Sequence, residues 1–195
     1  MASKASIRFE NKLKDVHALL DIHGDISGSR RGRREAKLRV LHKASIALLV
    51  AAWETYIESL LEEGVLFISG SALSGTEAEV HYDELQLLIK ENVQQAVRRL
   101  NTANAENVQV LFRNCFGIED IRESWGRTGL DWKKAYLALN QLLRERHSIV
   151  HGAMNDPEYR KRDVKSWLQF LRITVERTDL VVRDRIQALT GKTPW

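Results

Sequence analysis

Three side chains in the second half of the sequence have the types needed for chemistry on a phosphate group. Arg146 and His151 are five positions apart, and His147 directly follows the arginine. A histidine exchanges a proton near neutral pH, and a guanidinium binds phosphoryl oxygens through charge-assisted hydrogen bonds. An arginine and a histidine at this spacing also occur together by chance, so the pattern alone assigns no function.

Arg146 lies within the apolar stripe of a predicted helix from Asp131 to Ala153. Apolar residues recur in this segment every three or four positions, at Ala135, Tyr136, Leu139, Leu142, Leu143, Ile149, Val150 and Ala153. Because a buried arginine is rarely left unpaired, Arg146 should either line a cleft or interface or meet a buried acid.

On a regular helix, the side chains of Arg146 and His151 point in different directions. On an ideal helix Arg146 and His151 lie about 140° apart and about 7.5 Å along the axis. They can serve one site only if the helix loosens near Gly152 or if a second chain completes the site. His147 and His151 share a face. Two such histidines could bind a metal ion, but no third ligand is evident; favourable interaction with the helix C-terminus is the ordinary alternative.

The elements that must position these residues are predicted to be helices throughout. Helical apolar spacing marks the ranges 7–22, 34–67, 83–100, 104–116 and 131–153, and a long C-terminal helix is expected at 155–190. Asp131 is a predicted N-cap, and Gly117 a predicted helix end. Residues 69–80 are expected to form a loop and 118–130 to be irregular. The sequence therefore predicts one all-α domain over residues 1–195.

The helix over 34–67 is expected to be the central one, because its middle, Ile46 to Trp53, is apolar on every side. Glu54 directly follows this apolar block. It could be the acid that pairs with Arg146, or it could point to solvent where the helix becomes amphipathic. The sequence leaves both possibilities open.

A basic, flexible loop is predicted at residues 24–33, with arginines at its end. Arg30, Arg31, Arg33 and Arg34 could bind a phosphate backbone, or they could be a solvated basic segment. The net charge of +4 and the isoelectric point near 9.3 permit a nucleic-acid partner without requiring one. The lone Cys115 suggests a reducing compartment, and no apolar run approaches the length of a membrane span. A soluble, cytoplasmic protein is expected.

Three segments of the sequence resemble elements of the HEPN family. The first, similar to that family's arginine, polar residue, spacer and histidine motif, is Arg146-His147-Ser148-Ile149-Val150-His151-Gly152. The second, similar to an element of the RiboL-PSP-like branch, is Trp53-Glu54-Thr55-Tyr56-Ile57-Glu58. Phe116-Gly117-Ile118 is also similar to that branch, and the resemblance covers roughly Leu38 to Leu180. His147 stands where asparagine is commonest in the family.

The resemblance implies a HEPN-like helical bundle with ribonuclease activity, often that of a toxin or an anti-phage effector, acting without a metal ion or another cofactor. The site residues that it implies are Arg146, His151 and His147 for catalysis, with Glu54 and Tyr56 in support. For RNA binding we expect Arg144 together with the basic run Arg30, Arg31, Arg33 and Arg34. The active site would form in the cleft of a homodimer, and an antitoxin or defence-system partner is possible.

Two alternatives remain from the sequence. One is a catalytically silent HEPN module that binds RNA, a nucleotide or a protein partner. The other is a helical interaction protein in which Arg146 pairs with Glu54 only for packing.

Overall fold

The computed structural model describes residues 1–25, 31–73, 87–88, 91–96, 102–127, 129, 131–152 and 158–195, without the side chains of 23–25, 31–34 and 72–73. The described elements are helical and include no β-strand, which confirms the all-α prediction. They are α1 (Lys4–Asp25), α2 (Arg31–Leu73), α4 (Ala105–Phe116), the 3₁₀ helix η3 (Ile121–Trp125), α5 (Trp132–His151) and α6 (Lys161–Thr190).

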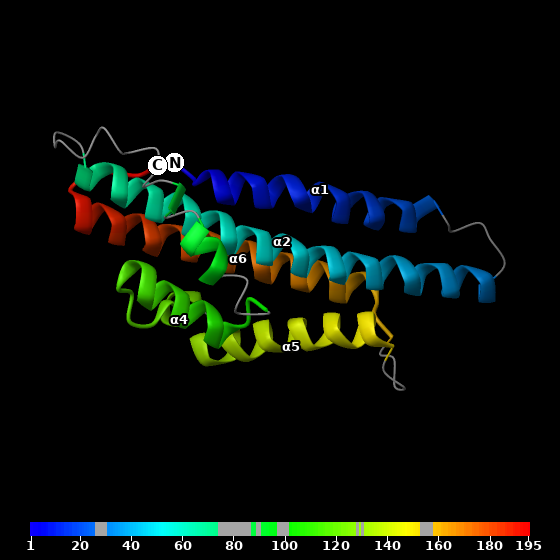
Figure 1. The fold of residues 1–195 in the computed structure, drawn as a ribbon. Helices are drawn as coiled ribbons and strands as arrows, with labels where there is room; N and C mark the ends of the chain where they lie inside the picture. The colour runs from blue at the N-terminus through cyan, green and yellow to red at the C-terminus, as the bar shows by residue number, and fades with distance from the viewer. Residues whose placement is uncertain are drawn as a thin grey trace.

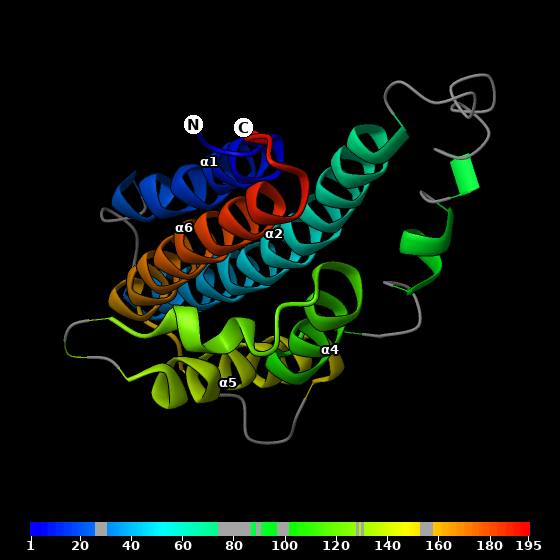
Figure 2. The ribbon, with the colours of Figure 1, turned by 90° about the vertical axis from the view of Figure 1, so that its left-hand side faces the viewer.

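The long helices α1, α2 and α6 lie side by side along the length of the molecule (Figure 1). Seen along the bundle, α4 and α5 cover the opposite side of α2 from α1 (Figure 2), and the chain termini lie close together. The C-terminal end of α5 and the N-terminal ends of α2 and α6 lie toward the same end of the bundle (Figure 1). This arrangement brings the motif helix to the central helix α2.

The core forms where α2 packs against α1 and α6. Buried side chains of α2 recur at helical spacing, at Ile46, Leu49, Val50, Trp53, Tyr56, Ile57, Leu60 and Leu61. On α1 the buried side chains include Phe9, Leu13 and Val16, whereas Ile7, the first apolar residue of the predicted helix 7–22, is 54% exposed. The periodicity identified the helix correctly, but the buried face is rotated away from Ile7.

One face of α2 is left open, which contradicts the prediction that its middle is surrounded on all sides. Val40 is 66% exposed and Leu48 is 37% exposed. We call this the open face of α2, and it consists of Val40, Ala44, Ala47, Leu48, Ala51 and Thr55, of which Ala51 is also exposed and the others half-buried. A helix that is apolar on every side can be buried on every side, but the sequence does not tell whether other helices of the same chain bury each of these sides.

By length and composition, Glu35–Ser71 within α2 could cross a membrane, and no other helix among the described residues passes that test. More than half of the most apolar stretch within Glu35–Ser71 is buried inside the protein. A core helix that packs against α1 and α6 has the same composition, so this observation gives no clear indication of a membrane protein.

Hydrogen bonds made by capping residues determine where two of the predicted helices begin or end. Asn104 accepts a hydrogen bond from the backbone N–H of Asn107 at 2.8 Å, and Gly117, with φ +65°, ends α4. Asp131 accepts from the N–H of Lys133 at 3.2 Å and caps α5 as predicted. Both caps depend on residues within three positions of the helix start, which is why the sequence alone located the cap of α5 and placed the start of α4 within one residue.

Several predicted boundaries are wrong. Helix α1 starts at Lys4, and α2 extends at both ends, from Arg31 to Leu73. Arg31 and Arg33 therefore lie in a helix rather than in the predicted loop over 24–33, and Arg34 is helical as predicted. Arginine is a good helix former, and the helix continues through the single Gly32. Arg30 lies outside the described residues, as does most of the predicted helix 83–100 and of the loop 69–80.

The segment predicted to be irregular, 118–130, contains η3. Asp120 caps this short helix, accepting from the N–H of Arg122 at 3.0 Å. Trp125 at its end is buried, lies edge-on to Trp53 and donates its indole N–H to the Thr178 hydroxyl of α6 at 3.0 Å. The packing of one tryptophan against α2 and α6 therefore orders a segment without a clear periodicity.

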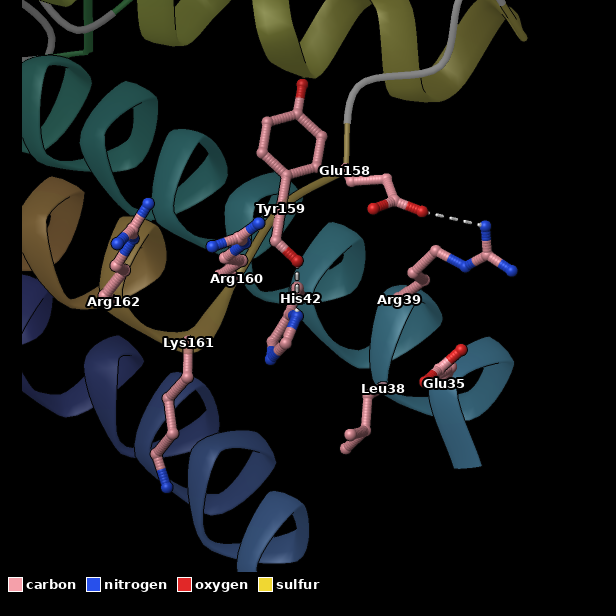
Figure 3. A pocket seen from close by; sticks show the side chains of 9 residues that line it. All are labelled: Glu35, Leu38, Arg39, His42, Glu158, Tyr159, Arg160, Lys161 and Arg162. Carbon is pink, nitrogen blue, oxygen red and sulfur yellow. Dashed lines mark hydrogen bonds and ion pairs between the residues drawn. The ribbon is translucent and has the colours of Figure 1, made fainter. Parts of the chain in front are cut away.

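Helix α6 begins at Lys161 rather than at 155, since residues 158–160 are not helical and the backbone of Arg160 is extended. The carbonyl oxygen of Tyr159 accepts a hydrogen bond from Nδ1 of His42 on α2 at 2.7 Å (Figure 3). Asp163 accepts from the N–H of Arg160 at 2.8 Å and satisfies the first turn of the helix. A contact between residues far apart in sequence thus sets the start of α6, while 153–157 lie outside the described residues.

Candidate active site

His147 and His151 lie together at the exposed end of α5. Their ring centroids are 4.3 Å apart with an interplanar angle of 41°, and both side chains are exposed. Gly152, with φ +63°, ends the helix one residue later and donates its N–H to the Ser148 carbonyl. The predicted sharing of a face is confirmed. The described residues contain no group of three or more His, Cys, Asp or Glu side chains that could hold a metal ion.

Arg146 is half-buried, at the point where the apolar stripe of α5 leaves the core. Leu139, Leu142 and Leu143 of the preceding turns are buried, whereas Val150, predicted for the same stripe, is 55% exposed. Helix α5 remains α-helical through His151. The helix therefore does not loosen before Gly152, and within one chain Arg146 and His151 point about 140° apart.

Glu54 of α2 lies within electrostatic reach of Arg146. Burial raises the pKa of Glu54, the positive charge of Arg146 lowers it, and the negative charge of Glu58 raises it, so that the pKa stands above its ordinary value. Among the described residues no hydrogen bond or ion pair joins Glu54 to Arg146. Glu54 is half-buried, so of the two possibilities left open by the sequence, the structure shows an electrostatic interaction with Arg146 but no direct hydrogen bond.

Tyr56 lies in the core rather than beside the motif residues. Its hydroxyl donates to the Val175 carbonyl of α6 at 3.1 Å, and its ring packs near Phe9 and Trp53. Any support that Tyr56 gives to the site is therefore through the packing of α2 against α6.

The predicted RNA-binding arginines are placed only in part. Arg144 is exposed on α5, three positions before His147 and seven before His151, so it lies on the side of the helix that carries the histidine pair. Arg31, Arg33 and Arg34 lie at the start of α2, where the structure does not describe their side chains.

A basic pocket of about 510 Å³ lies between the N-terminal parts of α2 and α6 (Figure 3). Its cationic and imidazole side chains are Arg39, His42, Arg160, Lys161 and Arg162. Two of these cationic side chains already have partners within the protein. Arg39 pairs with Glu158 at 3.3 Å, and Lys161 donates to the Leu20 carbonyl at 2.8 Å. We did not predict this pocket, although the run Arg160-Lys161-Arg162 at the start of the last helix was a sign of it.

Comparison with known proteins agrees with this architecture. The model of the RiboL-PSP-HEPN family matches residues 7–184, which include α2, the motif helix α5 and most of α6. No curated protein and no solved structure matches the sequence significantly. HEPN domains are helical and are often ribonucleases, and a role in nucleotide binding is the other activity that the family suggests. The match covers nearly the whole chain, and the chain belongs to the RiboL-PSP-HEPN family.

Proposed function

We propose that this protein is an endoribonuclease that cleaves single-stranded RNA without a metal ion. The observation that carries the proposal is the exposed His147–His151 pair at the end of α5, with Arg146 one residue away on the adjoining flank. A proton-transferring group and a fixed cation are the two groups that cleavage at a phosphodiester requires of a protein.

The reaction begins with attack of the ribose 2′-oxygen on the adjacent phosphorus. His151 accepts the 2′-hydroxyl proton or protonates the leaving 5′-oxygen, and the P–O5′ bond breaks. The guanidinium of Arg146 stabilises the negative charge that develops on the phosphoryl oxygens. The products are a 2′,3′-cyclic phosphate and a 5′-hydroxyl end. His147 positions the substrate or assists the proton transfer.

The proposed active form is a homodimer. Because Arg146 and His151 diverge on one helix, each cleft is completed by groups from two chains. The open face of α2 leaves apolar side chains, among them Val40 and Leu48, exposed in the single chain, and it adjoins Glu54 and therefore Arg146. Burial of this face against a second copy would place the two motif helices near a shared two-fold axis.

The decisive experiment is RNA cleavage with and without EDTA, using a DNA strand of equal sequence as the control. The proposal expects RNA cleavage in EDTA, a cyclic phosphate product and an intact DNA strand, since DNA lacks the 2′-hydroxyl. Complete loss of activity in EDTA, or cleavage of the DNA, would contradict the 2′-hydroxyl mechanism.

We further propose a toxin or anti-phage role in the cytoplasm, with an antitoxin or defence-system component as partner. A nuclease that attacks cellular RNA must be restrained until it is needed, and the lone Cys115 suits a reducing compartment.

A second candidate function is RNA or nucleotide binding without cleavage. The basic pocket between α2 and α6 supports it, because Arg39, Arg160 and Arg162 could hold phosphate groups there. RNA that is bound but never cut, with Arg146→Ala and His151→Ala binding as the parent does, would establish this function instead.

A further inference from the structure

A second cavity, also of about 510 Å³, lies between α5 and α6. Its α5 lining includes Gln141 and Glu145. Glu145 precedes His147 by two positions, so the cavity is on the opposite side of the helix from the histidine pair. Three carboxylates line it, from Glu145, Glu158 and Asp163, and one cationic side chain, the exposed Arg127. Glu158 and Asp163 are paired with arginines outside the lining, Arg39 at 3.3 Å and Arg162 at 3.5 Å. Glu145 therefore supplies the uncompensated negative charge of this cavity.

Glu145 is held in the cavity wall by neutral donors. Its carboxylate accepts from Nε2 of Gln141 at 3.0 Å and from the indole N–H of Trp167 at 3.1 Å. It forms no ion pair in the part of the chain that the structure describes. Burial and the nearby charge of Asp163 raise the pKa of this half-buried carboxyl, and its two hydrogen bonds offset part of that rise. A cation placed in the cavity would pair with this carboxylate.

Tyr159 provides an unused polar atom in the same wall. The residue is 7% exposed, and its hydroxyl has no hydrogen-bond partner among the described residues. Figure 3 shows the hydroxyl directed toward α5, away from the backbone carbonyl that His42 binds. Burial and the nearby charge of Glu145 raise the pKa of Tyr159 to about 12, so the phenol stays neutral and its oxygen can accept a hydrogen bond. Buried polar atoms are rarely left unsatisfied.

Aromatic rings complete the lining. Trp167 is half-buried and packs edge-on against Phe170, with ring centroids 6.0 Å apart. The indole N–H of Trp167 donates a hydrogen bond to Glu145, so the ring and the carboxylate are held in a defined relative position. An aromatic surface beside a carboxylate is the combination that a planar cation uses, with stacking on the ring and hydrogen bonds to the oxygens.

We propose that this cavity binds a guanidinium group carried on an alkyl chain, with Glu145 as its counter-ion, the Tyr159 oxygen as a further acceptor and Trp167 as the stacking surface. The planar guanidinium offers five N–H donors, which suits a wall made of acceptors. The unpaired carboxylate of Glu145 repels a nucleotide, whose phosphate is negative. The volume exceeds that of one arginine side chain, so groups flanking the guanidinium are accommodated as well. The guanidinium can come from an arginine of a partner protein or from a free small molecule.

The test uses the full-length protein and N-acetyl-arginine-methylamide as the probe. Its matched control is the citrulline analogue, which has nearly the same shape but no charge. Binding is followed by NMR through the indole N–H resonance of Trp167, identified with the Trp167→Phe variant. We expect the arginine compound to shift this resonance in a saturable way and the citrulline compound to bind at least about tenfold more weakly, because hydrogen bonds to a charged group are stronger.

Two variants of the wall separate the contributions. Glu145→Gln keeps the shape and an acceptor for Trp167 but removes the charge, and it should weaken binding about ten- to a hundredfold. Tyr159→Phe removes only the unpartnered hydroxyl and should weaken binding about threefold to tenfold. The control Glu176→Gln makes the same charge change at an exposed position of α6 outside the cavity and should bind as the parent does.

Equal binding of the arginine and citrulline compounds, or unchanged binding in both wall variants, would overturn the proposal. Binding of adenosine at the Trp167 resonance with no response to the arginine compound would show a nucleobase site instead. An arginine-containing peptide that binds much more tightly than the single residue identifies a protein partner as the source, whereas equal affinities identify a small molecule. None of these measurements depends on RNA cleavage, so the proposed ribonuclease function can fail or stand separately.

Discussion

The imidazole rings of His147 and His151 lie 4.3 Å apart, centroid to centroid, at the exposed C-terminal end of α5. This contact places two proton-exchanging groups within reach of one phosphate, with Arg146 on the adjoining flank of the helix. The roles of the three residues can be separated by substitution, because none of the three side chains is fully buried.

Removal of the proposed catalytic groups should abolish most of the cleavage. We expect His151→Ala and Arg146→Ala each to lower the rate at least about a hundredfold, because an acid or base contributes about 10²–10⁴-fold and a charge-stabilising donor about 10²–10³-fold. His147→Asn should be milder, since asparagine is the commonest family residue there. Gel-based cleavage rates measure the effect, with His17→Ala and Arg8→Ala as controls away from α5. A His151→Ala enzyme as fast as the parent would exclude the assigned role.

The coupling between Glu54 and Arg146 should appear as a pH-dependent stability. Burial raises the pKa of Glu54 above its ordinary 4.5, so the contribution of this group to folding is present below pH 4.5 and is lost as the pH rises through the folded-state pKa. The positive charge of Arg146 lowers the pKa of Glu54 and so reduces the stability that is lost as the pH rises. Arg146→Ala should therefore be more destabilised at pH 7 than at pH 4.5, by about 1 kcal/mol because both groups are partly exposed.

Urea unfolding at several pH values measures this difference. Adding Glu54→Gln to the Arg146→Ala variant should remove the additional loss at pH 7, because no carboxylate is then left without its cation. Strictly additive effects of the two substitutions at pH 7 would show that the residues do not interact.

The open face of α2 should be required for assembly. Ala51→Arg adds a charge in the middle of this face, at an exposed position where the folded monomer loses only about 0.5 kcal/mol or less. We expect a folded monomer without cleavage activity, as judged by light scattering and circular dichroism. Leu137→Arg, at an exposed position of α5 outside the open face, is the matched control and should remain dimeric. A parent protein that is monomeric at micromolar concentration would refute the dimer.

Tyr56 should matter for stability and not for the chemical step. Tyr56→Phe removes the hydroxyl that donates to the Val175 carbonyl at 3.1 Å and should lower the free energy of unfolding by about 1 kcal/mol. Cleavage well below the melting temperature should stay within about twofold of the parent rate, because the hydroxyl lies in the core. A large fall in rate with unchanged stability would instead assign Tyr56 a role in the site.

Arginines outside the motif should control RNA binding and its salt dependence. Replacing Arg31, Arg33 and Arg34 together by Gln, or Arg144 alone, should weaken binding and reduce the slope of log K against log salt by about 0.7 for each lost phosphate contact. The rate at saturating RNA should change little. Fluorescence anisotropy over a range of salt concentrations provides the measurement, and an unchanged slope would mean that these arginines do not contact phosphates.

The sequence by itself determined the parts of the fold that depend on near neighbours. Asn104, Gly117 and Asp131 mark helix ends because their side chains or backbones act on groups within a few positions. The shared face of His147 and His151 follows from the pitch of the helix in the same way. Helix type, the all-α class and the exposed His pair could therefore be predicted, and the family match agrees with the motif.

Only the tertiary structure decided how distant segments meet. It left one face of α2 open, brought Glu54 within electrostatic reach of Arg146, and joined Tyr159 to His42 by a hydrogen bond at the start of α6. At Gly64 an added Cβ would lie 2.7 Å from the Phe116 ring, a close approach that no local pattern indicates. Burial depends on which surfaces pack together, and this packing involves residues from the whole chain. Caps and helical faces, in contrast, depend on residues within one or two helical turns.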